Sequence, residues 1–269
     1  RSVFRTMVKT PCCSSRGSRP VARQPGRELS PGARVATRGQ RVWRSAAAAL
    51  GLALLFAGPL AAQTPRLHFQ HNGVSPPGAI GSWQLQRGGP LPGYFQPVEL
   101  FGPPGLEIAV TDAGTFRPLQ PAPVKVGLLI APVYRFRVAN IPLHPGAEVF
   151  PSIELIDRTY PPAGERWRFP IPVEVAEEDL KLALSGRFVT RVIYIEDPLS
   201  ALPVAENPRE QRWFDAGAGA DPLLTADTLG RPVAILRMGG RIPRHDLGED
   251  DLIKGNPPLV YFHPQRPEP

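Results

Sequence analysis

Apolar and polar residues alternate with a period of two along much of the chain after residue 90. In residues 166–175 the apolar positions are Trp167, Phe169, Ile171, Val173 and Val175. In residues 133–138, Tyr134, Phe136 and Val138 alternate with arginines. This alternation is typical of half-buried strands, so both segments are predicted strands whose apolar residues, Trp167 included, face the core.

Two further segments, 124–131 and 187–196, are apolar at successive positions, which indicates central strands covered on both faces. Shorter strands are predicted at 94–100, 106–110, 148–156 and 233–238. Turn sequences such as His-Pro-Gly at 144–146 and Pro-Pro-Ala-Gly at 161–164 separate them. Seven or eight short strands separated by such turns predict an all-β fold, an immunoglobulin-like β-sandwich.

One short helix is predicted over residues 176–185. Its apolar face contains Leu180 and Ala183, three acidic residues at 177–179 suit the positive end of the helix dipole, and Gly186 supplies a stop. The alternative is a strand in which alternate leucines point inward.

Pro170 and Pro172 lie two residues apart in a predicted strand, so both missing N–H groups belong to the same side of it. A strand that lacks donors on one side belongs at the edge of a sheet. These prolines also discourage pairing with a second copy of the chain.

Residues 44–63, RSAAAALGLALLFAGPLAAQ, contain a basic flank, a short apolar run, a Gly-Pro break and small residues, in that order. This order predicts a signal peptide over 41–62, with cleavage near Ala62–Gln63. A retained anchor or a buried core helix are the alternatives. Residues 1–40 are basic and poor in apolar residues, and are predicted to be a disordered leader or an upstream translation artefact.

The remaining chain divides into a predicted β-sandwich domain over 66–242 and a proline-rich tail over 243–269, either an extended arm or disordered. The sandwich contains a long loop over 199–230. Thirty of the 35 prolines follow Gln63, which excludes long helices there.

The net charge of +7 comes from the leader. Residues 1–44 contain 11 of the 31 basic residues and one of the 24 acidic ones, so the rest of the chain has 20 basic and 23 acidic residues. A net charge of about −3 argues against nucleic-acid binding by the mature domain. Both cysteines, Cys12 and Cys13, precede the predicted cleavage site, so no disulfide or thiol ligand is expected after it.

The sequence contains none of the common catalytic or phosphate-binding motifs, and we expect no cofactor and no metal site. The acidic stretch that starts at His245 matches no calcium-loop template and is predicted to be a solvated loop.

Trp213 and Phe214 are the candidate binding residues. They are adjacent in the loop 199–230, between charged residues and a glycine-rich run. Such a pair either pins the loop to the domain or forms a contact surface.

The stretches PVYRFRVANIPLHPGAE, RFVTRVIYIEDP and LGRPVAILRMGGR resemble a family of exported bacterial proteins of unknown function, over about residues 124–242. The resemblance implies localisation to the periplasm or cell surface and no particular activity. We therefore predict a non-catalytic binding or structural module of the bacterial cell envelope. Its partner would be an envelope protein or polysaccharide, with no nucleic acid and no stable membrane span after cleavage. The alternative is a hydrolase or carbohydrate-active enzyme with a site in the loop 199–230.

Overall fold

The computed structural model describes residues 4–9, 75–112, 114–199, 201, 211–217, 219–242 and 257–261. They all belong to one compact unit, made of residues 1–12 and 66–269. The predicted signal peptide and its cleavage site lie outside the described residues. None of the helices within these ranges is long and apolar enough to cross a membrane.

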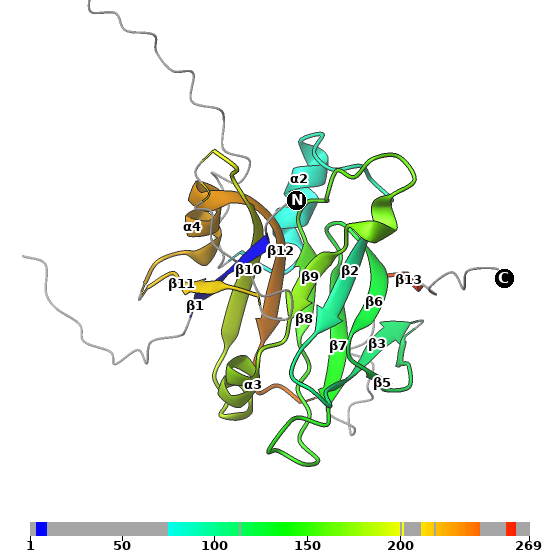
Figure 1. The fold of residues 1–269 in the computed structure, drawn as a ribbon, viewed down its shortest axis with the longest axis vertical. Coiled ribbons are helices and arrows are strands. Elements are labelled where there is room, and N and C mark those ends of the chain that lie inside the picture. The colour runs from blue at the N-terminus through cyan, green and yellow to red at the C-terminus, as the bar shows by residue number, and fades with distance from the viewer. Residues whose placement is uncertain are drawn as a thin grey trace, which may run out of the picture. The chain divides into compact units, whose positions relative to one another are not determined.

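The fold is mostly β, with two open sheets (Figure 1). The larger sheet contains, in spatial order, β11 (Trp213–Asp215), β1 (Phe4–Lys9), β10 (Val189–Glu196), β12 (Gly230–Met238), β8 (Ser152–Leu155), β7 (Val133–Ala139), β3 (Glu107–Asp112) and β4 (Thr115–Phe116), and β5 (Gln120–Pro121) also pairs with β3. The smaller sheet contains, in order, β13 (Val260–Tyr261), β6 (Val124–Leu129), β2 (Phe95–Phe101) and β9 (Ile171–Glu174). Most pairs are antiparallel, whereas β2–β9 and β1–β11 are parallel.

Side chains from both sheets form one hydrophobic core, so the sheets pack as a sandwich. The alternating residues of β7 show how: Tyr134, Phe136 and Val138 are at most 2% exposed, while the arginines between them lie partly in solvent. The two predicted central strands are confirmed, because β6 lies between β13 and β2 and β10 lies between β1 and β12.

A second apolar cluster covers the outer face of the larger sheet. Helices α2 (Ala79–Gln86) and α4 (Pro222–Leu229) pack there against β10 and β12. Its buried members are Ile80, Ile156, Val192, Tyr194, Leu223, Ala226 and Ile235. Strands β10 and β12 are therefore apolar on both faces because both faces are covered.

The predicted helix at 176–185 is confirmed as α3 (Glu177–Leu184), and the strand alternative is wrong. Leu180 and Ala183 are fully buried against the core, and Glu177, Glu178 and Asp179 occupy the first turn. Gly186 follows the helix with φ +80°, a left-handed conformation that glycine adopts without strain.

Two features of the predicted loop 199–230 differ from the expectation. Residues 213–215 form β11, and α4 begins at Pro222. The side chain of Asp221 accepts a hydrogen bond from the backbone N–H of Leu223 at 2.9 Å, so Asp-Pro forms an N-cap followed by a proline in the first turn. The Asp-Pro pair at 221–222 is a helix-start signal that is visible in the sequence, although the prediction treated this segment as a loop.

The predicted strand at 166–175 is confirmed only over β9. Residues Arg166–Arg168 form a 3-10 turn, η1, in which the N–H of Arg168 donates to the carbonyl of Glu165 at 2.9 Å. A turn does not alternate its side chains across a sheet, so the expected core packing of Trp167 is wrong. Trp167 is 37% and Phe169 is 42% exposed.

The prediction that the proline-containing strand lies at an edge is confirmed, because β9 pairs with β2 alone among the described strands. Gln211 Nε2 donates to the carbonyl of Pro172 at 3.3 Å. The N and C=O of one strand residue point to the same side, so the missing donor of Pro172 faces away from β2.

Strand β1 was not expected, because it lies within the segment 1–40 for which we predicted disorder. Its six residues pair antiparallel with β10, from Phe4 opposite Ile195 to Lys9 opposite Thr190. Its other side pairs in parallel with β11. The expectation of disorder is wrong for these six residues, because two strands offer backbone partners to them; the rest of the segment lies outside the described residues.

Residues 257–261 of the proline-rich tail form an extended arm on the smaller sheet, as one of the two alternatives predicted. The hydroxyl of Tyr134 donates to the carbonyl of Pro258 at 2.9 Å and accepts from the N–H of Leu129 at 2.9 Å. Tyr134 thus joins the arm to β6 and β7.

The Tyr134→Phe variant should reveal this link through pH. Burial raises the pKa of Tyr134 to about 12, above the unfolded value of 10. Between pH 10 and 12 the unfolded chain releases the Tyr134 proton while the folded chain still holds it, which favours unfolding. The contribution of the Tyr134 hydroxyl to stability is therefore complete below pH 10 and is lost as pH rises to 12. The loss is about 2–3 kcal/mol. The wild type should therefore exceed the variant by about 1–3 kcal/mol at neutral pH, and this difference should shrink above pH 10. Urea unfolding across this range measures it.

Tyr160→Phe, at a tyrosine that is 60% exposed, serves as the control. Parallel pH profiles for wild type and Tyr134→Phe would contradict the assignment.

Candidate functional site

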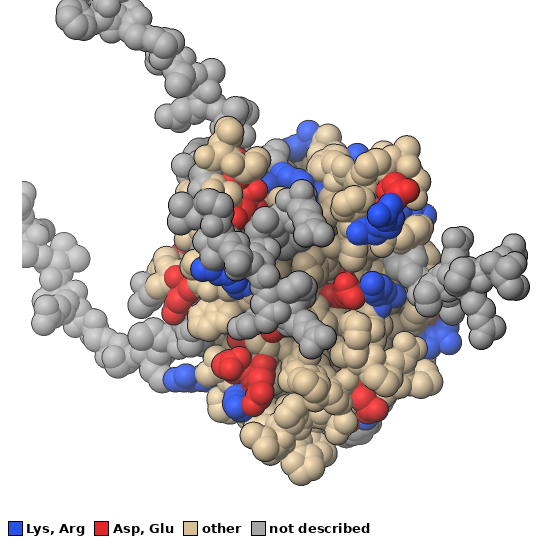
Figure 2. Space-filling model, in the orientation of Figure 1, with Lys and Arg blue, Asp and Glu red and all other residues tan. Residues whose placement is uncertain are grey.

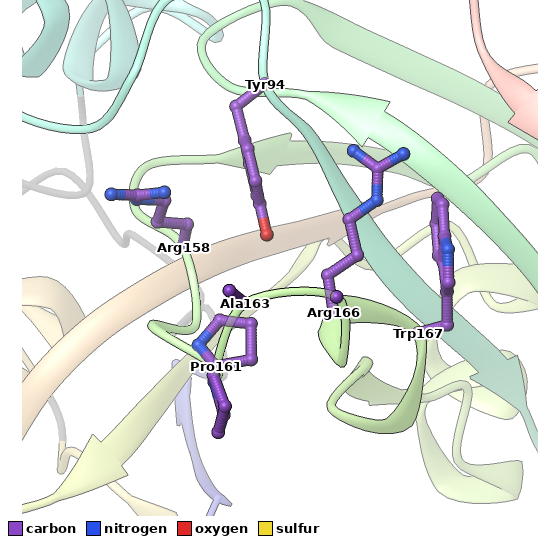
Figure 3. Close-up of a pocket in the computed structure, with 8 residues that line it drawn as sticks. Tyr94, Arg158, Pro161, Ala163, Arg166 and Trp167 are labelled. Atoms are coloured by element: carbon purple, nitrogen blue, oxygen red, sulfur yellow. The ribbon is translucent and has the colours of Figure 1, made fainter.

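A pocket of about 520 Å³ opens beside the start of β2. Tyr94 enters from the residue before β2, Arg158 follows β8, and Arg166 and Trp167 belong to η1 (Figure 3). The remaining wall is the loop Pro161–Pro162–Ala163–Gly164. Two segments that lie more than 60 positions apart, Tyr94 and residues 158–167, therefore form one opening.

A buried glutamine holds the loop of the pocket against β2. Gln96, which is fully buried, accepts from the N–H of Thr159 at 2.8 Å and donates from Nε2 to the carbonyl of Pro97 at 2.9 Å. The hydroxyl of Thr159 lies 3.1 Å from the carbonyl oxygen of Phe169. Both ends of the segment 159–169 are thus anchored.

Aromatic rings and guanidinium groups alternate around the opening. The guanidinium carbon of Arg158 lies 5.0 Å from the ring centre of Tyr94 and 4.5 Å from that of Tyr160. The guanidinium carbon of Arg166 lies 4.1 Å from the ring centre of Trp167. Each distance is within the range of a cation–π contact. These contacts orient the two arginines without neutralising them.

The nearby carboxylates are bonded to other arginines. Asp157 forms an ion pair with Arg231 and also accepts from the hydroxyl of Tyr160 at 3.2 Å. Glu165 accepts from Nη1 of Arg168 at 2.8 Å. Within the described residues, neither of the arginines that line the pocket forms an ion pair with these carboxylates.

The eight lining residues consist of two aromatic residues, two arginines, two prolines, an alanine and a glycine. None of the eight carries a carboxylate, an imidazole, a thiol or an aliphatic hydroxyl. In the part of the chain that the structure describes, no three His, Cys, Asp or Glu side chains gather where a metal ion could be held. The arrangement suits binding by stacking and by charge.

The candidate residues Trp213 and Phe214 lie on β11 and do not line this pocket. They are 50% and 40% exposed. The guanidinium carbon of Arg191 lies 5.7 Å from the ring centre of Trp213, and Arg191 forms a buried ion pair with Asp179 of α3. The structure therefore places Trp213 beside this ion pair.

Sequence reasoning missed the pocket, although it recognised the turn at 161–164. Gly164 adopts φ +81°, and the N–H of Glu165 donates to the carbonyl of Pro162 at 3.1 Å. The loop projects from the sheet there, which brings Trp167 to the surface. The acidic stretch that starts at His245 lies outside the described residues.

Basic and acidic side chains are interspersed on the face of the molecule shown in Figure 2. A surface that binds nucleic acid through its phosphates gathers basic residues in one patch or stripe. The visible face does not have this distribution.

Comparison of the chain with protein-family models, with curated proteins and with solved structures gave no match.

Proposed function

We propose that the protein is a non-catalytic binding module of the bacterial cell envelope, exported to the periplasm or cell surface and built as an immunoglobulin-like sandwich. The observation that carries this proposal is the pocket of Tyr94, Arg158, Arg166 and Trp167. It combines exposed aromatic faces with two arginines, and its lining lacks the paired carboxylates that a glycosidase uses.

The setting in the envelope rests on the signal sequence and on the family resemblance. The sandwich supports a binding role because two sheets with a shared core hold the loops at their ends in fixed positions. The partner is an envelope polysaccharide or an envelope protein.

The Trp167→Ala variant tests the proposal. Trp167 contributes a large, partly exposed ring to the pocket, and aromatic residues often dominate binding free energy. We expect the apparent affinity for isolated envelope fractions to fall roughly tenfold or more. Co-sedimentation of protein purified from cells that express the full chain measures this.

Trp83→Ala is a matched control, because Trp83 is also 37% exposed but lies on α2, outside the pocket. It should bind as the wild type does. The Trp213→Ala/Phe214→Ala variant tests the competing surface. If only the Trp213→Ala/Phe214→Ala variant loses binding, the pocket is not the binding site. Release of new sugar ends from the envelope material by the wild type would instead favour the alternative, a carbohydrate-active enzyme.

A further inference from the structure

The two arginines of the pocket present uncompensated positive charge. Asp157 is paired with Arg231 and Glu165 with Arg168. The Nε atom of Arg158 is buried and has no hydrogen-bond partner among the described residues. Nε is shielded from solvent, so a ligand in the pocket would be bound through the terminal nitrogens of the two guanidinium groups, whose charge favours an anion.

The geometry of the pocket suits a planar anion next to a flat apolar surface. In Figure 3 the ring of Tyr94 stands between the side chains of Arg158 and Arg166, and Trp167 lies beyond Arg166. A guanidinium group can donate two parallel N–H bonds to one carboxylate. An arginine lies over one face of Tyr94 and one face of Trp167, and the opposite face of each ring can pack against the C–H face of a pyranose ring.

A peptide that binds by adding a strand fits the same surface less well. This mode of binding requires the protein to supply backbone N–H donors. Pro161 and Pro162 form part of the wall and have no N–H. The wall therefore offers side chains and rings rather than a strand edge.

We infer that the pocket binds a carboxylate-bearing sugar, a uronate residue within an acidic polysaccharide. Arg158 and Arg166 would bind carboxylates of the polysaccharide, and Tyr94 and Trp167 would support its sugar rings. This inference rests on the proposed function, since it names the ligand class of the same site.

The test compares short oligogalacturonates with their methyl esters, which have the same sugar backbone but no charge. Protein from the full chain is titrated with each, and tryptophan fluorescence or calorimetry reports binding. The acidic form should bind at least about tenfold more tightly than the ester, because hydrogen bonds to charged groups are the stronger ones. Added salt should reduce the difference.

The Arg158→Gln/Arg166→Gln variant should lose that preference, whereas Arg168→Gln should keep it. Arg168 is two residues from Arg166 but is paired with Glu165 and does not line the pocket. Thermal melts check that each variant is folded. If the double variant does not fold, Arg166→Gln alone decides, because Arg166 is exposed.

Four results would overturn the inference. They are equal affinity for acid and ester, an unchanged preference in the folded arginine variant, tighter binding of an oligoglutamate peptide, and no binding of either sugar. In each case, envelope binding that still depends on Trp167 would leave the proposed function standing. Loss of that dependence is the separate failure of the proposed function.

Discussion

Replacing Asp179 by alanine is expected to lower the free energy of unfolding by about 3–5 kcal/mol. Nε of Arg191 on β10 donates to Oδ2 of Asp179 on α3, and both side chains are only 3% exposed. Nη1 of Arg191 is already buried without a hydrogen-bond partner among the described residues. Without Asp179, a buried guanidinium would have no counter-charge. Urea unfolding measures the change.

A double variant separates the charge from the packing. In Asp179→Leu/Arg191→Met both charges are replaced by apolar side chains, and the stability should return close to that of the wild type. Glu177→Gln is the control on the same helix, because its partner Lys181 is 47% exposed, and it should change stability by less than about 1 kcal/mol. A loss in Asp179→Ala no larger than in the control would show that the buried pair contributes little.

The environment of Asp179 predicts how the stability of the single variant Arg191→Met depends on pH. Burial raises the pKa of Asp179, and the hydrogen bond and charge of Arg191 oppose that rise. Without Arg191, the buried carboxyl should take up a proton that the unfolded chain has released. The variant should therefore recover stability as pH falls through the raised pKa, and this recovery should be absent from the double variant.

Replacing Gly81 by alanine is expected to cost about 3 kcal/mol or more. A Cβ atom at this position would lie 2.5 Å from Cα of Ala131 and 2.7 Å from the carbonyl oxygen of Leu155. Both are backbone atoms that cannot rotate away, so α2 must move from the sheet. The N–H of Gly81 donates to Oε1 of the fully buried Glu154 at 3.0 Å, and this bond would be lost as well.

The loss of Gly81 packing should appear in two measurements. The free energy of unfolding should fall, and the native-state tryptophan fluorescence, to which Trp83 on α2 contributes, should change. Gln86→Ala, at an exposed position of the same helix, should stay within about 0.5 kcal/mol of the wild type. Native-like fluorescence and stability in Gly81→Ala would mean that α2 does not pack closely on Ala131 and Leu155.

Local patterns predicted those parts of the fold in which a strand or helix buries one face. Tyr134, Phe136 and Val138 alternate with polar residues because β7 has one face in the core. Pro170 and Pro172 are tolerated because one side of β9 pairs with no other described strand. These properties belong to consecutive residues, so they are visible in the sequence.

Contacts between distant segments could not be predicted in this way. Helix α2 depends on the close approach of Gly81 to Ala131 and Leu155, which lie 50 or more positions away. The pocket likewise forms only because Tyr94 lies close to Arg158 and Trp167, which are more than 60 positions away in the sequence. The sequence pattern assigned Trp167 to core packing and gave no role to Gly81 or Arg158. Only the folded chain shows that they share a cavity.

The position of β1 connects the predicted cleavage after Ala62 with the predicted contact surface at Trp213 and Phe214. Cleavage after Ala62 would remove β1, and with it the partner of β10 along six residue pairs. Strand β11, which pairs only with β1 among the described strands, would lose its support. Trp213 and Phe214 lie on that strand. In a processed chain β11 would have no strand partner among the described strands, although Gln211 would still bond to β9. The edge of β10 beside Trp213 and Phe214 would then be open to another strand.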